Sequence, residues 1–196
     1  WKGGSKPANL VKSYRPLGIM EHVGNSLGGV AHDWIRDEIR FDPSHFGSRP
    51  ETDCSMAIWA LLEIEQRALQ CNLAVLTIFY DIVNFFCSIP HELILDDLRA
   101  LGASEELLAL ISLLHQDTTY NMSMNGISSS ILAHKGIIQG GRASPDEAAV
   151  VINQRMREVQ GQRPLSHHIL VSFSEPISGQ RVSLVANDVS YVDDIA

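Results

Sequence analysis

The pattern of apolar positions and helix-capping residues along the chain predicts a series of helices joined by short turns. Thr52 or Asp53 can cap the second helix, Ser104 can cap the fourth, and Gly102 is a natural stop for the third. The predicted helices span residues 23–39, 52–67, 90–101, 104–115 and 144–159.

The start of the last of these helices carries a complete capping signal. Ser144 is predicted at the N-cap position, with Pro145 at the first helical position and Glu147 at the third. This arrangement predicts that the helix begins directly after Ser144.

Extended segments are predicted from two other patterns. Residues 73–80 are almost entirely apolar, with β-branched and aromatic side chains, which predicts a fully buried strand that ends at Asp81. Two alternating runs around Asn125-Gly126 predict a β-hairpin within residues 120–137. Three other segments are predicted to be extended: a short strand within 11–20, then 169–173 and 182–192.

These elements follow one another without an internal repeat, a low-complexity tract or a convincing linker. The order of helices and strands mixes both types, so we expect one α+β unit spanning residues 1–196. Residues 1–10 and 41–50 are rich in glycine, proline and polar side chains, which predicts loops.

Composition narrows the class of protein. The 196 residues are 45% hydrophobic and 19% charged, which is ordinary for a globular protein. No apolar run approaches the roughly 20 residues of a membrane-spanning helix, so we expect no membrane association. The N-terminus lacks a signal-peptide pattern, and the three cysteines fit neither a disulfide framework nor a zinc site. An intracellular location with reduced thiols is therefore predicted.

The charge distribution bears on nucleic-acid binding. A net charge of −8 opposes phosphate binding, yet the first twenty residues contain four basic side chains and no acidic one. The acidic excess lies mainly in predicted helices, where charge usually faces solvent. Net charge therefore does not decide the question.

Three carboxylates stand at the ends of apolar segments and are candidates for chemistry. Asp81 ends one predicted strand, and Asp193 and Asp194 end another. Adjacent like charges beside a buried strand repel each other, and a divalent cation would relieve that repulsion; Mg²⁺ prefers such hard oxygen ligands. The alternative is that each is an ordinary strand-end or turn residue. Spacing along the chain does not show whether the two acidic elements meet.

A glycine-rich segment, residues 136–141, precedes Ser144. Glycines before a helix can let the backbone approach a nucleotide and offer N–H groups to its phosphates. Such loops are common, so this signal is weak by itself.

Taken together, five segments resemble the conserved motifs of reverse transcriptases, in the order that family shows. The resemblance is greatest to enzymes of group II introns and non-LTR retroelements. The segments are Tyr14-Arg15-Pro16-Leu17-Gly18-Ile19, Phe46-Gly47-Ser48-Arg49-Pro50, Asp81-Ile82-Val83-Asn84-Phe85-Phe86-Cys87-Ser88-Ile89, Gly136-Ile137-Ile138-Gln139-Gly140-Gly141-Arg142-Ala143-Ser144-Pro145 and Tyr191-Val192-Asp193-Asp194.

This resemblance implies the fingers and palm of a right-hand polymerase, with fingers over about residues 1–70 and mainly palm, containing motifs A, B and C, over about 71–196. A strand bearing Asp81 would lie beside a hairpin bearing Asp193 and Asp194, and the three carboxylates would hold two Mg²⁺ ions, with Mn²⁺ as a possible substitute. The implied activity is RNA-directed DNA polymerisation, in which a nucleotidyl group passes from a dNTP to a primer 3′-hydroxyl.

The same matching implies roles in substrate binding. Phe86 would pack under the incoming sugar, and the neighbouring Phe85 would pack in the core. The alternative for Phe86 is that it is itself a core-packing residue. Gln139 and Gly140 would line the nucleotide pocket, and Arg15 would meet the triphosphate, with Lys12 as a possible helper. The implied partners are an RNA template, a DNA primer and dNTPs, with a nuclear location if the element is eukaryotic.

Several features depart from the family pattern. Cys87, Arg142 and Ala143 replace residues that are usual there, and the chain stops two residues after Asp194. We therefore expect the strand returning from the Asp193–Asp194 hairpin, the thumb and the accessory domains to be absent. We also expect the isolated chain to have little or no activity. A degenerate, non-catalytic palm that at most binds nucleic acid is the second hypothesis, and another palm enzyme such as a nucleotide cyclase is a third. For His91, at a predicted helix start, we predict a capping or structural role and not a catalytic one.

Overall fold

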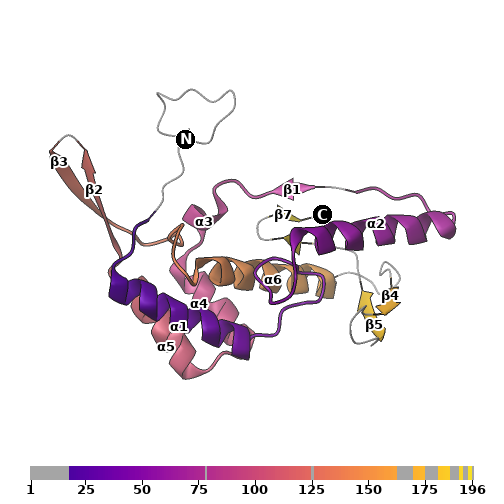
Figure 1. Ribbon diagram of the computed structural model, residues 1–196, viewed down its shortest axis with the longest axis horizontal. Helices are drawn as coiled ribbons and strands as arrows, with labels where there is room; N and C mark the ends of the chain where they lie inside the picture. The colour runs from indigo at the N-terminus through magenta and orange to yellow at the C-terminus, as the bar shows by residue number, and fades with distance from the viewer. Residues whose placement is uncertain are drawn as a thin grey trace.

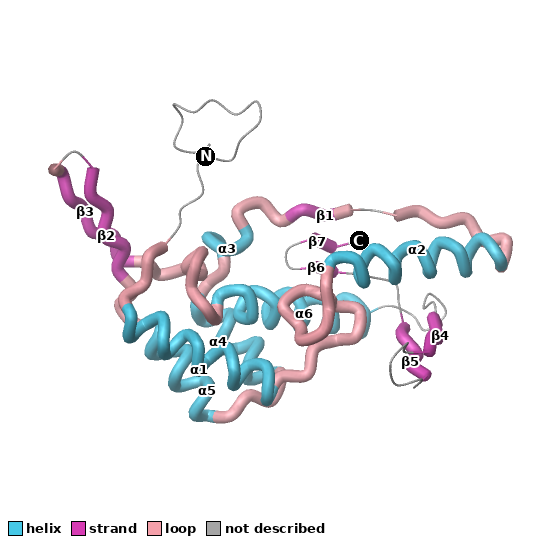
Figure 2. The backbone as a smooth tube through the Cα atoms, viewed as in Figure 1, coloured by secondary structure: helices cyan, strands magenta, loops and turns pink. Residues whose placement is uncertain are grey.

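The computed structural model describes residues 18–77, 79–124 and 126–162, together with the backbone of four short strands between residues 170 and 195. Figures 1 and 2 show how these elements are arranged in space. The elements are α1 (His22–Glu38), α2 (Cys54–Gln70), β1 (Tyr80–Asp81), α3 (Phe85–Ser88), α4 (His91–Ala100), α5 (Glu105–His115), β2 (Thr119–Met124), β3 (Ile127–Leu132), α6 (Ser144–Gln162), β4 (Leu170–Ser174), β5 (Arg181–Val185), β6 (Ser190–Tyr191) and β7 (Asp194–Ile195).

Helices α1, α4, α5 and α6 form the body of the molecule, with α3 above them (Figure 1). Their apolar faces meet in one cluster, and each helix contributes side chains that are almost completely removed from solvent. Burial of this apolar surface is the main stabilising contribution to the body. The largest of the fully buried side chains in this cluster are Ile35, Ile94, Leu98, Leu107, Ile111 and Ile152.

The predicted helix ends are confirmed where the signals are local. The Asp53 carboxylate accepts a hydrogen bond from the backbone N–H of Met56, so Asp53, and not Thr52, caps α2. Ser104 caps α5 in the same way, accepting from Leu107. Gly102 follows α4 with a φ of 87°, which a side chain would disfavour.

The predicted N-cap role of Ser144 is wrong. The helix α6 includes Ser144, and the Ala143 carbonyl accepts from the N–H groups of Asp146 and Glu147. The Ser144 hydroxyl instead donates to the Ile138 carbonyl at 2.6 Å. The helix therefore begins one residue earlier than predicted, because the serine hydroxyl binds the preceding loop and not the helix.

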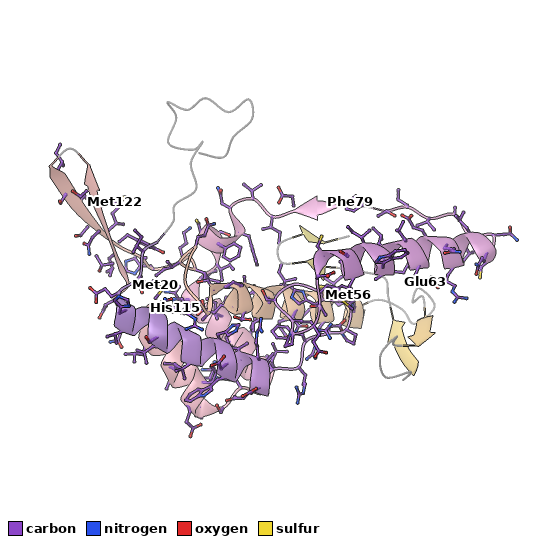
Figure 3. All side chains as sticks on the ribbon, in the orientation of Figure 1. Met20, Met56, Glu63, Phe79, His115 and Met122 are labelled. Atoms are coloured by element: carbon purple, nitrogen blue, oxygen red, sulfur yellow. The ribbon has the colours of Figure 1, made fainter. Side chains whose placement is uncertain are left out.

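The prediction of a buried strand over residues 73–80 is also wrong. Strand β1 contains only Tyr80 and Asp81, and the described residues before it are largely exposed, with Leu76 at 83% and Phe79 at 73%. An apolar run becomes a buried strand only where a neighbouring strand or helix covers it. Figure 3 shows Phe79 on this extended segment, away from the helical body.

The predicted hairpin is confirmed as β2 and β3, joined at Asn125-Gly126. The strands pair antiparallel from Thr119 opposite Leu132 to Met124 opposite Ile127. Gly126 has a φ of 78°, the conformation that two-residue hairpin turns require. The hairpin extends from the body at the left of Figure 1.

The C-terminal strands form two small sheets. Strands β4 and β5 make an antiparallel pair, so the extended segments predicted at 169–173 and 182–192 each contain a strand. Strands β1, β7 and β6 form a three-stranded sheet in that order. The expectation that the strand returning from the Asp193–Asp194 hairpin would be absent is wrong, because β7 is that strand and lies at the centre of this sheet.

Two further expectations concern the strand predicted near the N-terminus and membrane-spanning helices. The strand predicted within residues 11–20 lies mostly outside the described residues, and 18–20 contain none. Among the helices that the structure describes, none has the length and apolar character needed to cross a bilayer.

Candidate metal and nucleotide site

The three-stranded sheet places two of the predicted metal ligands, Asp81 and Asp194, opposite each other on paired strands. Strands β1 and β7 pair antiparallel, with Tyr80 opposite Ile195 and Asp81 opposite Asp194. Directly opposed residues of an antiparallel pair have Cα atoms about 4.5–5.5 Å apart. Asp81 and Asp194, separated by more than a hundred residues, are therefore immediate neighbours across the strands.

Strand β6 completes this arrangement from the other side. It pairs with β7 so that Tyr191 lies opposite Asp194. Asp193 belongs to the connection between these two strands and lies outside the described residues, as do Arg15 and Lys12. The structure thus places Asp81 and Asp194 at one register position of the sheet.

The surroundings of Asp81 suit an acceptor for a cation. Its side chain is exposed, and no hydrogen bond or ion pair to it occurs within the described part of the chain. Among the side chains that the structure describes, no three His, Cys, Asp or Glu residues are grouped so that they could hold a metal ion. The described side chains do not include those of Asp193 and Asp194. The donors contributed by this position would be carboxylate oxygens, which suit Mg²⁺ or Mn²⁺.

The chain turns sharply after β1 and places two phenylalanines differently. Asn84, with a φ of 54°, precedes the short helix α3. Phe85 is 6% exposed in the core, whereas Phe86 is only partly buried against it. Their rings meet edge to face with centroids 5.9 Å apart. Phe85 thus has the packing position, and Phe86 retains an accessible part.

The glycine-rich loop of residues 136–141 is attached to α3 through its backbone. The N–H of Ile137 donates to the carbonyl of Phe86 at 2.6 Å, and that of Gly136 donates to Ile89 at 2.7 Å. Gly136 has a φ of 97°, and a Cβ there would lie 3.1 Å from the Cys87 carbonyl oxygen. The loop can approach α3 this closely because it has no side chain at this point.

The other end of the loop meets the segment that contains Arg15. Gly18, three residues after Arg15, donates from its N–H to the Gln139 carbonyl at 2.9 Å. A Cβ on Gly140 would lie 2.9 Å from the Gly18 carbonyl oxygen, so the two backbones are in direct contact. Phe86, Gln139 and Gly140 therefore lie along one continuous backbone contact that ends at Gly18.

Two acidic residues at the start of α6 lie in the interior, which sequence reasoning did not foresee. The Asp146 carboxylate, 1% exposed, meets His32 Nδ1 at 2.5 Å and Arg36 Nε at 3.5 Å. Burial raises the pKa of Asp146, and the hydrogen bond and charge of His32 act against that shift. These contacts attach the start of α6 to α1.

The second acidic residue belongs to a group of buried polar side chains under the loop. Glu147 Oε2 accepts from His115 Nε2 at 3.1 Å, and the His115 ring stacks on that of His91 with centroids 4.3 Å apart. His91 Nε2 lies 2.9 Å from the Gly136 carbonyl oxygen. Burial lowers the pKa of His91. The structural role assigned to His91 thus has a specific contact.

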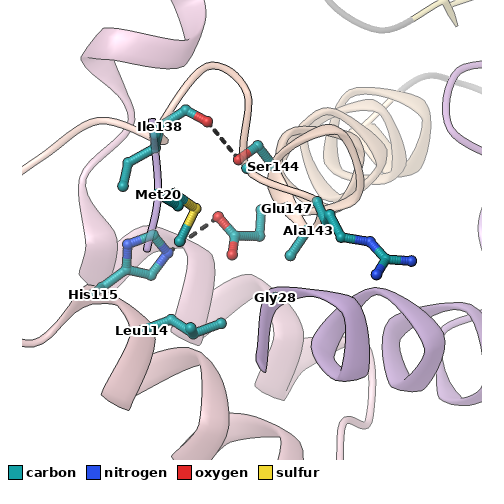
Figure 4. A pocket seen from close by; sticks show the side chains of 10 residues that line it. Met20, Gly28, Leu114, His115, Ile138, Ala143, Ser144 and Glu147 are labelled. Atoms are coloured by element: carbon teal, nitrogen blue, oxygen red, sulfur yellow. Dashed lines mark hydrogen bonds and ion pairs between the residues drawn. The ribbon is translucent and has the colours of Figure 1, made fainter. Parts of the chain in front are cut away.

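A small pocket of about 20 Å³ separates part of the loop from these residues. Figure 4 shows it between Met20, His115, Glu147 and the Ser144–Ile138 hydrogen bond. The volume admits about one water molecule, so the pocket cannot itself hold a nucleotide.

Comparison with known proteins adds no assignment. No model of a known protein family matches this chain, and no curated protein gives a significant match.

Proposed function

We propose that this chain is a reverse-transcriptase-like palm and fingers unit whose reaction is nucleotidyl transfer from a dNTP to a primer 3′-hydroxyl on an RNA template. The observation that carries the proposal is the register of the small sheet. It sets Asp81 opposite Asp194, beside the Tyr191-Val192-Asp193-Asp194 segment. The two acidic strand ends had no reason to be neighbours if each were an independent turn residue.

The proposal includes two Mg²⁺ ions, because carboxylate oxygens are the hard ligands that Mg²⁺ prefers. Asp81, Asp193 and Asp194 would hold them, and the exposed Asp81 carboxylate has no competing cation within the described residues. Bound there, the metal ions would lower the charge barrier between the primer hydroxyl and the triphosphate. Phosphoryl transfer depends mainly on charges held in fixed positions. Two paired strands can hold the carboxylates of Asp81 and Asp194 in such positions.

The contact between the loop and its neighbours supports a nucleotide site next to these carboxylates. The half-buried Phe86 follows Asp81 by five residues and hydrogen-bonds through its carbonyl to the loop that carries Gln139 and Gly140. In this proposal Phe86 contacts the sugar, Gln139 and Gly140 line the pocket, and Arg15 neutralises phosphate charge.

A degenerate, non-catalytic palm that at most binds nucleic acid is the second hypothesis. It is favoured by the net charge of −8, which weakens the attraction for a phosphate backbone.

Asp81→Asn separates the two hypotheses. It removes a charge from an exposed position, so we expect no change in folding. We expect primer extension on an RNA template, assayed with the chain continued through a thumb because the chain alone is expected to have little activity, to fall at least roughly 100-fold. Even groups that only support a metal ligand contribute about 10–100-fold. Binding of Mn²⁺, followed by its effect on water proton relaxation, should weaken in parallel.

Asp33→Asn is the matched control, since it makes the same change at an exposed aspartate of α1. It should leave both measurements unaltered. Loss of Mn²⁺ binding in Asp81→Asn, with no extension by the otherwise unmodified chain continued through a thumb, would support the non-catalytic alternative. Equal behaviour of Asp81→Asn and Asp33→Asn in both assays would exclude the metal site.

A further inference from the structure

The loop that carries Gln139 and Gly140 has little intrinsic preference for its observed shape. Three of its six residues are glycines, and Gly136 and Gly140 have φ values of 97° and 111°. Glycine loses more conformational freedom on ordering than any other residue. A loop of this composition needs contacts from outside to hold one conformation.

Side chains supply two of those contacts, one at the first residue of the loop and one at the third. Ser144 Oγ donates to the Ile138 carbonyl at 2.6 Å, and His91 Nε2 lies 2.9 Å from the Gly136 carbonyl. A carbonyl oxygen can only accept, so His91 carries a proton on Nε2 and donates it.

His91 is itself held in place by two other helices. Its ring, at the start of α4, stacks on that of His115 at the end of α5, with centroids 4.3 Å apart. His115 Nε2 in turn meets the carboxylate of Glu147 in α6 at 3.1 Å. His115 and Glu147 side chains are 9% and 4% exposed, so this pair is screened little by water.

We propose that His91 is a positioning residue for nucleotide binding, and that with His115 and Glu147 it forms a brace for residues 136–141. The brace transmits the rigidity of α4, α5 and α6 to the loop backbone at Gly136. From there the loop continues to Gln139 and Gly140, where it contacts Gly18. The identity of the ligand, a dNTP, rests on the proposed function. The brace itself rests on the observed contacts of His91, His115 and Glu147.

Three substitutions in the full chain test this. His91→Phe keeps an aromatic ring on His115 but removes the donor, and His91→Gln places an amide donor where Nε2 stood. His22→Ala is the matched control, since His22 is likewise the first residue of a helix but is exposed. Circular dichroism establishes that each variant is folded.

For the brace itself the measurement is amide hydrogen exchange at Gly136 and Ile137, which donate to Ile89 and Phe86. We expect exchange at both amides to accelerate several-fold in His91→Phe, and to stay near the original rate in His91→Gln and His22→Ala. Unchanged exchange in His91→Phe would overturn the brace, whether or not the chain is an enzyme.

For the positioning role the measurement is the KM for dNTP in primer extension by the chain continued through a thumb. His91→Phe should raise KM about 3–10-fold, the effect of one hydrogen bond, with a smaller change in kcat. His91→Gln should restore KM and His22→Ala should not alter it. A fall in kcat without a rise in KM, or a failure of glutamine to restore KM, would overturn the role.

The two proposals fail in different ways. If the chain continued through a thumb extends no primer while His91→Phe accelerates exchange at Gly136 and Ile137, the proposed function is wrong and the brace stands. If extension depends on Asp81 but exchange and KM are insensitive to His91, the function stands and the brace is wrong.

Discussion

The arm formed by α2 and residues 71–79 is richer in apolar residues than the helical body, yet its apolar side chains are much less buried. In the body, Ile94 and Leu98 of α4, which packs against α5 and α6, are completely buried. In the arm, Trp59 is 71% exposed and Leu76 is 83% exposed, and no residue of α2 belongs to the core cluster. Apolar periodicity therefore predicts an element, while burial depends on whether another element covers it.

The physical reason lies in the number of neighbours. Each body helix packs on at least two others, so its apolar stripe meets apolar partners. Among the described elements, α2 makes its main contact with the short strand β6, and it buries only Ala57, Ile64 and Ala68. The hydrophobic effect is proportional to the area removed from water, so the arm contributes much less to stability than its sequence suggests.

The largest effect is expected from Leu98→Ala in the body. This substitution removes a fully buried side chain and leaves a cavity among three helices. We expect the free energy of unfolding to fall by about 2–5 kcal/mol, measured by urea denaturation. A loss below about 1 kcal/mol would mean that the body is not the closely packed core described above.

An intermediate effect is expected in the loop between the two regions. Burial lowers the pKa of His45 from 6.5 to about 4, and its ring stacks on Phe41. The unfolded chain therefore binds a proton before the folded one as the pH falls. His45 contributes full stability above about pH 6.5, and this contribution is lost as the pH falls toward 4.

His45→Phe keeps the stacking and removes the titration. Between about pH 7.5 and 5, the original chain should lose roughly 2 kcal/mol more unfolding free energy than this variant. Burial raises the pKa of Asp97 to about 6, which acts in the opposite direction, but it does so in both proteins and cancels in the difference. His22→Ala should keep the original pH dependence, and an equal pH dependence in His45→Phe would contradict the assignment.

The smallest effect is expected from Leu76→Ala in the arm. It is the same chemical change as Leu98→Ala, made at a side chain that is already largely in solvent. We expect the unfolding free energy to change by no more than about 0.5 kcal/mol. A loss comparable to that of Leu98→Ala would show that the arm is covered in solution and that the comparison between the two regions is wrong.

Much of the secondary structure could be predicted from the sequence. Asp53, Ser104 and Gly102 act on backbone groups within about three residues, so their effect is contained in the local sequence. The Asn125-Gly126 turn is local in the same way. Ser144 failed as a cap because its hydroxyl found an acceptor at Ile138, six residues earlier, in a loop whose shape the sequence does not specify.

The candidate site was predictable only in part. The motifs pointed to Asp81, Asp194, Phe86, Gln139 and Gly140, but they gave no sign that Asp146 and Glu147 would be buried and paired with histidines. A carboxylate in the first turn of a helix is usually a solvated, dipole-stabilising group. Its burial depends on α1 and α5 lying against that turn.

What the sequence by itself determined, then, is where helices, turns and candidate carboxylates occur, because those depend on neighbours a few residues away. The tertiary structure decided which apolar segments are buried, and it set Asp81 opposite Asp194 and His91 against Gly136. These contacts join residues far apart in the chain, and they form only when packing of the body and pairing of the strands offset the entropy of bringing them together.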